Sequence, residues 1–131
     1  MNLSPGSELK LKSCHEKLQT LVHLIAAVMP VIVLEGERGE VEQHIAFTTG
    51  RSKLDYPHSK HNSKPSMAVD LAPAPYDPKD LRRLLCFCGY VLGVASAMGI
   101  RIRSGASWSH LPNPVDPLKD FSDLFHFELE T

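Results

Sequence analysis

The chain has 131 residues, the length of one ordinary domain and enough to bury a hydrophobic core. Its composition, 43% hydrophobic and 22% charged, is typical of a globular protein and excludes a disordered or fibrous chain. The net charge of −1 and the lack of a basic run argue against nucleic acid as a partner. The three cysteines have no disulfide-like spacing, which indicates folding in a reducing compartment.

The most apolar stretch, residues 21–34, is interrupted by His23 and Pro30. It is too short to span a bilayer, so no membrane insertion is expected. The first residues lack the basic start and apolar stretch of a signal peptide. We therefore expect the protein to stay in the cytoplasm in which it is made until another protein releases it. We also expect a monomer and a single domain over residues 1–131, with residues 1–6 flexible.

In the first part of the chain, apolar residues recur at helical spacing from Leu11 to Met29. They predict one helix that begins near Ser7 and ends at Pro30. Residues 31–34 are rich in β-branched side chains and predict a buried strand.

A short second helix is predicted over residues 40–48, with Val41 and Ile45 facing inward. Residues 49–65 are polar and rich in turn formers, so they predict a long loop. Loops of this length in compact domains are usually functional.

The second half of the chain contains a predicted strand at residues 67–71 and a helix that begins at Asp77-Pro78 and runs to about Ala97. Further strands are predicted at residues 100–103 and 126–130, with a proline-rich loop between them. Together the elements predict an α+β domain in which helices pack on one face of a small, mostly antiparallel sheet. The predicted inward face of the long helix consists of Leu81, Leu84, Leu85, Cys88, Leu92 and Ala95.

Two segments far apart in the chain contain residues that suit a metal ion. His61 and Asp70 flank a short loop, and His126 follows Asp123 by three residues near the end of the chain. Two imidazoles and one carboxylate can hold zinc, and three protein ligands with a fourth position left to water are typical of a catalytic zinc site. His58 is an alternative ligand to His61. The other histidines are interpreted as structural; they are His15, His23, His44 and His110.

At these segments the chain resembles the LAS metallopeptidases, and most closely their phage endolysin branch of L-alanyl-D-glutamate and D-Ala-D-Ala peptidases. The resemblance covers residues 15–130. The segments that carry it are Ser59-Lys60-His61…Ala68-Val69-Asp70, Asp123-Leu124-Phe125-His126-Phe127-Glu128 and Glu35-Gly36-Glu37-Arg38…Gln43.

This resemblance implies a fold like that of the hedgehog and D-Ala-D-Ala peptidases, with zinc bound by His61, Asp70 and His126. It implies that Asp123 is the catalytic carboxylate and that Arg38 meets the substrate. The expected function is that of an endolysin, a phage metallopeptidase that lyses bacteria by degrading their cell wall. This hydrolase would cut a peptidoglycan stem peptide, with L-Ala-D-Glu as the expected bond.

Several alternatives stay open at the level of sequence. The bond could instead be D-Ala-D-Ala, another zinc hydrolase could share the scaffold, or the protein could be a non-catalytic zinc-containing part of the virion. Cobalt or manganese could replace zinc. Arg38 could pair with Glu40 or Glu42 at the surface, and the involvement of Ser52 stays open. Glu128 is expected either to face solvent or to support a metal ligand.

Overall fold

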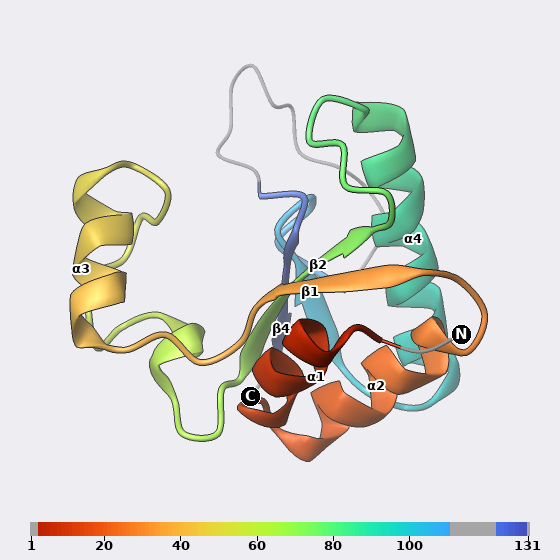
Figure 1. Cartoon of the computed structure of the whole chain (residues 1–131), viewed down its shortest axis with the longest axis horizontal. Coiled ribbons are helices and arrows are strands. Elements are labelled where there is room, and N and C mark those ends of the chain that lie inside the picture. Colours follow the sequence, from red (N-terminus) through yellow and green to blue (C-terminus); the bar gives the residue numbers. More distant parts are fainter. Residues whose placement is uncertain (1–2, 111–122, 131) are drawn as a thin grey trace.

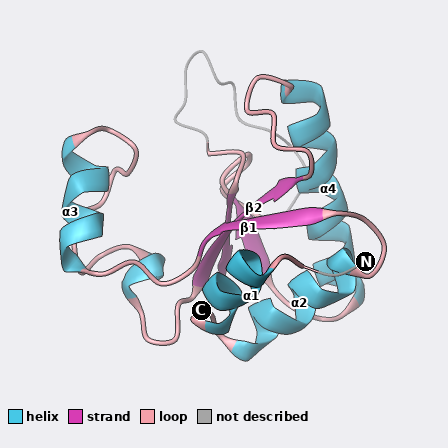
Figure 2. Ribbon diagram, viewed as in Figure 1, coloured by secondary structure: helices cyan, strands magenta, loops and turns pink. Residues whose placement is uncertain are grey.

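The computed structural model describes residues 3–110 and 123–130, so most of the predicted proline-rich loop lies outside the described residues. Two helices come first in the described part of the chain and two strands come last, and a short 3-10 turn, η1, precedes the second strand (Figures 1 and 2). The helices are α1 (Pro5–Lys12), α2 (Glu16–Ala26), α3 (Glu40–Thr48) and α4 (Leu81–Ala97), and η1 spans Lys60–Asn62. The strands are β1 (Val31–Glu35), β2 (Ala68–Pro73), β3 (Ile102–Ser104) and β4 (His126–Leu129).

The four strands form one antiparallel sheet in the order β1-β2-β4-β3, which confirms the predicted α+β class. Successive side chains of a strand point to opposite faces. Val33, Leu71 and Phe127 therefore lie on one face and are fully buried beneath α1, α2 and α4. Asp70 and His126 lie on the opposite face, away from these helices. The sheet thus separates the hydrophobic core from a polar face.

Helix α2 supplies much of the core, because Leu18, Leu21, Val22 and Ile25 are each 0% exposed. Burying a side chain of this kind stabilises a fold by roughly 1.5–3 kcal/mol. No helix in the described part of the chain is long and apolar enough to cross a membrane.

The single helix predicted before Pro30 is two helices, so that prediction was wrong. The chain breaks at Ser13–His15 because Ser66 pairs with it: the Ser66 N–H donates to the Ser13 carbonyl at 2.9 Å, and the His15 N–H donates to the Ser66 carbonyl at 2.8 Å. His15 caps α2 by accepting a hydrogen bond from the Lys17 N–H. Helix α1 starts at Pro5, inside the segment for which flexibility was expected.

Helix α3 has the predicted bounds, but the prediction of its inward residues was wrong. Val41 and Ile45 are 67% and 47% exposed, whereas Gln43 and Ala46 are buried. The reason is visible in Figure 1, where α3 stands to one side of the other helices and does not cover the sheet. An amphipathic pattern identifies the helix but does not say which face finds a partner.

Helix α4 begins at Leu81 with Asp80 as its N-cap, three residues after the predicted start at Asp77-Pro78. Leu81 and Leu85 are exposed, which corrects the predicted inward face. Phe87 and Val91 are buried instead, beside the correctly predicted Leu84, Cys88, Leu92 and Ala95.

Candidate active site

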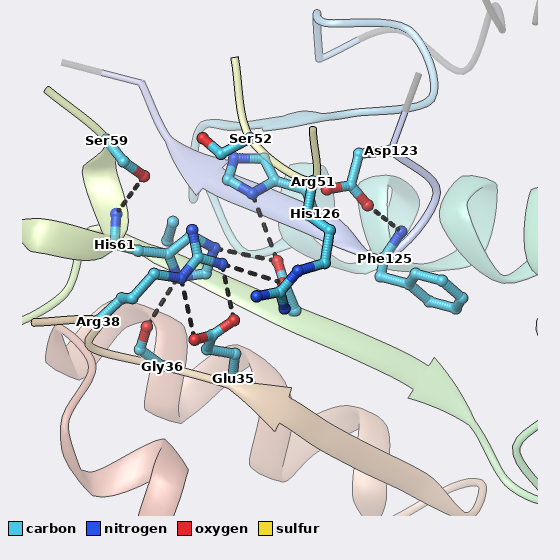
Figure 3. Close-up of polar contacts among 12 residues, drawn as sticks. Glu35, Gly36, Arg38, Arg51, Ser52, Ser59, His61, Asp123, Phe125 and His126 are labelled. Carbon is cyan, nitrogen blue, oxygen red and sulfur yellow. Dashed lines mark hydrogen bonds and ion pairs between the residues drawn. The ribbon is translucent and has the colours of Figure 1, made fainter. Parts of the chain in front are cut away.

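The polar face of the sheet brings together the three residues expected to hold a metal. Asp70 of β2 and His126 of β4 are direct cross-strand neighbours, and His61 lies in η1, just before β2. One ligand atom from each of the three lies within 4.8 Å of the others, and the cluster is at most partly accessible (Figure 3). Residues 61, 70 and 126 therefore form a possible metal-binding triad.

The ring of His61 lies between the backbone carbonyl of Gly36 and the carboxylate of Asp70. Its Nδ1 lies 2.7 Å from the carbonyl oxygen of Gly36, and its Nε2 lies 3.0 Å from Asp70 Oδ1. A carbonyl only accepts, so Nδ1 carries the proton. In the neutral ring, Nε2 then directs its lone pair toward the centre of the triad.

His126 repeats this arrangement with its nitrogens reversed. Its Nδ1 lies 3.4 Å from Asp70 Oδ1, and its Nε2 lies 2.8 Å from Glu128 Oε1. Metal-binding histidines usually donate their outer N–H to such an acceptor, which sets the orientation and the tautomer of the ring. Of the two alternatives for Glu128, the structure favours support of the ligand, since this side chain is buried and bonded to His126.

Electrostatics keep the carboxylates of this cluster charged. Burial alone would raise the pKa of Asp70, but hydrogen bonds with His126 and His61 hold it far below its usual range. Burial would lower the pKa of His126, yet hydrogen bonds to Asp70 and Glu128 raise it to about 9. A metal ion would displace the proton that His126 holds toward Asp70, and the triad would then offer two imidazole nitrogens and an ionised carboxylate oxygen. This donor set fits zinc, which accepts nitrogen and oxygen ligands.

Asp123 lies three residues before the start of β4, beside the triad (Figure 3). Its N–H donates to the Gly105 carbonyl at 2.9 Å, and its Oδ1 accepts from the Phe125 N–H at 3.1 Å. A side chain at Gly105 would collide with the Asp123 backbone, so glycine permits this close approach. Burial and the negative charge of Asp70 raise the pKa of Asp123.

Arg38 lies in the wall of the site, and its partner is Glu35, not Glu40 or Glu42. Its Nε and Nη2 donate to the Glu35 carboxylate at 2.9 and 2.7 Å. Its Nη1 donates to Gln43 Oε1 at 2.8 Å, and Nη2 lies 4.0 Å from Asp70 Oδ2. Arg38 is therefore held in a fixed position close to the triad.

A cleft of about 280 Å³ is lined by His61 and His126 of the triad and by both Arg38 and Asp123. His58 and Ser52 also line it, but His58 is not part of the metal cluster found among the described residues. Ser52 Oγ accepts from Gln43 at 3.0 Å and donates to the Leu54 carbonyl at 2.9 Å. The remaining lining residues are Lys53, Leu54, Ser59, Lys60, His61, Arg103, Trp108, His126 and Glu128.

Three charged residues in or beside the cleft were not identified from the sequence, namely Glu35, Lys60 and Arg103. Glu35 is held against Arg38, whereas Lys60 and Arg103 meet at Glu128, each 3.3 Å from its Oε2. Glu35 and Lys60 lie in the segments that carry the family resemblance, but no role in the site was predicted for either of them or for Arg103. The pairing of β3 with β4 places Arg103 opposite Glu128.

A possible nitrogen–oxygen metal site beside a partly buried carboxylate, in an open cleft, is the arrangement of a metal-dependent hydrolase. The chain matches the phage L-alanyl-D-glutamate peptidase family over residues 1–130 and belongs to that family. It is a phage peptidase that acts on the stem peptide of peptidoglycan, as its sequence motifs indicated.

A similar solved structure is the crystal structure of the Serratia marcescens L-Ala D-Glu endopeptidase ChiX. The two chains share 24% sequence identity with a TM-score of 0.74, and the match covers 98% of this chain and 90% of that chain. The similarity shows a common fold. Among curated proteins, none matches this chain.

Proposed function

We propose that this protein is a zinc-dependent endolysin that hydrolyses the L-Ala–D-Glu amide of the stem peptide. His61, Asp70 and His126 are the zinc ligands in this proposal, and Asp123 is the catalytic carboxylate. The observation that carries it is the convergence of the triad and Asp123 in one cleft, in a chain of this peptidase family.

A zinc ion bound by the triad would polarise the substrate carbonyl and lower the pKa of its water. Asp123 has the remaining task of moving a proton. Its carboxylate accepts a proton from the attacking water and returns it to the amine as the carbon–nitrogen bond breaks. The products are the new carboxyl group of L-Ala and the free amine of D-Glu, so atoms and charge balance.

Arg38 is proposed to hold the substrate. A guanidinium has five N–H donors, and Glu35 and Gln43 together receive three from Arg38. Because Arg38 lines the cleft, its remaining donors can bind a carbonyl oxygen of a substrate there, or the negative charge that develops on it. Glu35 and Gln43 then act by holding the guanidinium still.

We further propose that the protein acts as a monomer at the host cell wall, after release from the cytoplasm. The described cleft supports a monomer, because one chain supplies the triad, Asp123 and Arg38. Size-exclusion chromatography with light scattering tests this, and an active dimer with an inactive monomer would contradict it.

The test of the proposed function is digestion of purified peptidoglycan by the wild type and by Asp123→Asn, with bound zinc counted and products identified by mass spectrometry. The variant is expected to keep its zinc and to lose about 10²–10⁴-fold in rate, the usual contribution of a general acid–base group. Asp77→Asn, a change at an exposed residue outside the cleft, is the matched control.

The fragments decide which bond is cut, since L-Ala–D-Glu and D-Ala–D-Ala cleavage release products of different mass. A zinc-loaded wild type that releases no fragment from any wall type would favour the non-catalytic alternative. An Asp123→Asn variant with full activity would remove Asp123 from the mechanism.

A further inference from the structure

The cleft does not end at the triad but continues along β3 and β4. A second cavity of about 470 Å³ shares Lys60, Arg103, Trp108 and Glu128 with the first. Ser109 and Glu130 extend its lining. A peptide that places its scissile bond at the triad can therefore continue over Arg103.

Arg103 is positioned at the junction of the two cavities. It faces Glu128 across the β3–β4 pair, and its guanidinium carbon lies 5.6 Å from the centre of the Trp108 ring. Its buried Nε lies 3.3 Å from Glu128 Oε2 but makes no hydrogen bond within the described part of the chain. The side chain is 39% exposed, so solvent or a ligand can reach it.

The single negative charge of Glu128 does not balance the two positive charges of Lys60 and Arg103. One of its oxygens accepts from His126, and the other faces both Lys60 and Arg103. One carboxylate thus faces two permanent cations. Glu130, which also lines the second cavity, is paired with Arg101 at 2.7 Å, so this part of the cleft keeps an excess of positive charge. A guanidinium with donors to spare, set on an aromatic ring, is suited to bind a carboxylate through two parallel hydrogen bonds.

The two halves of the proposed substrate differ in charge next to the bond that is cut. In the stem peptide, D-Glu is linked onward through its γ-carboxyl group, so its α-carboxylate is free and sits on the carbon that bears the scissile nitrogen. The L-Ala half is linked through amides and has no free carboxylate. A cation beside the triad can therefore distinguish the two halves and set the direction of the peptide.

We propose that Arg103, assisted by Lys60, binds the α-carboxylate of the D-Glu residue and so selects D-Glu on the amine side of the cut. Arg103 is favoured for this residue because it lines the same cavity as the triad, whereas carboxylates of the third residue lie several bonds further along the peptide. The inference rests on the proposed function and names the group that this site recognises.

The test compares two soluble tripeptide substrates that differ only at D-Glu, one with the free α-carboxylate and one with D-isoglutamine, its α-amide. The measured quantity is the ratio of the two kcat/KM values for wild type, Arg103→Gln, Arg103→Lys and Arg82→Gln. Arg82 is an exposed residue of α4 outside both cavities, so its variant controls for the loss of one positive charge.

A hydrogen-bonded charge pair corresponds to about a tenfold to hundredfold effect. Wild type and Arg82→Gln are expected to prefer the carboxylate substrate by this factor. Arg103→Gln should lose the preference through a higher KM for that substrate alone, and Arg103→Lys should regain part of it. The ratio is insensitive to partial misfolding, because both substrates meet the same enzyme preparation.

An Arg103→Gln variant that loses the same factor on both substrates, or keeps the wild-type preference, would overturn the inference while leaving the proposed function intact. A wild type that cuts neither tripeptide but does cut intact peptidoglycan at L-Ala–D-Glu would move recognition to the glycan and would also overturn it. A wild type inactive on tripeptides and peptidoglycan alike would remove the proposed function itself.

Discussion

Gly36 packs against helix α1 and also accepts a hydrogen bond from the candidate metal ligand His61. The substitution Gly36→Ala tests whether stability and zinc binding depend on this close packing. The Gly36 carbonyl oxygen accepts the His61 Nδ1–H at 2.7 Å. A Cβ at this position would collide with the Lys10 carbonyl oxygen and Ser13 Oγ and lie 3.0 Å from Cys14 Sγ. The Lys10 oxygen belongs to the backbone of α1 and cannot rotate away, so β1 and α1 must separate.

Overpacking of this kind costs about 1–3 kcal/mol of the free energy of unfolding. The Gly36 carbonyl would also move away from the Nδ1–H of His61, which should weaken zinc binding by about 10–100-fold. Urea denaturation of the metal-free protein measures the first effect, and a zinc titration against a competing chelator measures the second.

Gly93→Ala is the matched control, because nothing lies within 4 Å of a Cβ at that position in α4. It should stabilise the protein by about 0.5–1 kcal/mol through helix propensity. If Gly36→Ala unfolds at the same urea concentration as Gly93→Ala and binds zinc as tightly, the argument from close approach is refuted.

Three further predictions follow from contacts of the site and core. Glu128→Gln should lower zinc affinity about 10–100-fold in a chelator competition, whereas exposed Glu16→Gln should not; equal affinities would deny Glu128 its role in orienting His126. Phe127→Ala should reduce the free energy of unfolding by about 3–5 kcal/mol, because this ring is 0% exposed, while Phe47→Ala should change it by less than about 0.5 kcal/mol; similar urea midpoints would argue against the assigned core. Arg38→Lys should cost about 1–3 kcal/mol in the same assay, since a lysine cannot replace the paired bonds to a carboxylate, and an unchanged midpoint would count against that pairing.

The sequence predicted the elements that have a strong local signal. β-branched residues marked β1, and the bounds of α3 followed from its pattern. Long-range pairing decided the rest. The pairing of Ser66 with the Ser13–His15 segment split the first helix, although its apolar spacing runs on without interruption. Local periodicity contains no information about a backbone partner fifty residues away.

The candidate site shows the same division. Residue types suggested His61, Asp70 and His126 as possible ligands, because few side chains suit zinc, and the family resemblance implied the same set with Asp123 as the catalytic carboxylate. The sequence could not say which nitrogen of each ring faces the centre. That orientation depends on the Gly36 carbonyl and on Glu128.

The sequence by itself determined the fold class, the family and the candidate ligands of this protein. Only the tertiary structure decided that the triad lies on the face of the sheet opposite the helices, and that Arg38 is held by Glu35. It also placed Arg103 and Lys60 around the Glu128 carboxylate, where the two cavities meet. The physical reason is that an ion pair forms only between side chains that lie close in space. Strand register and loop packing bring together residues that are far apart in the sequence.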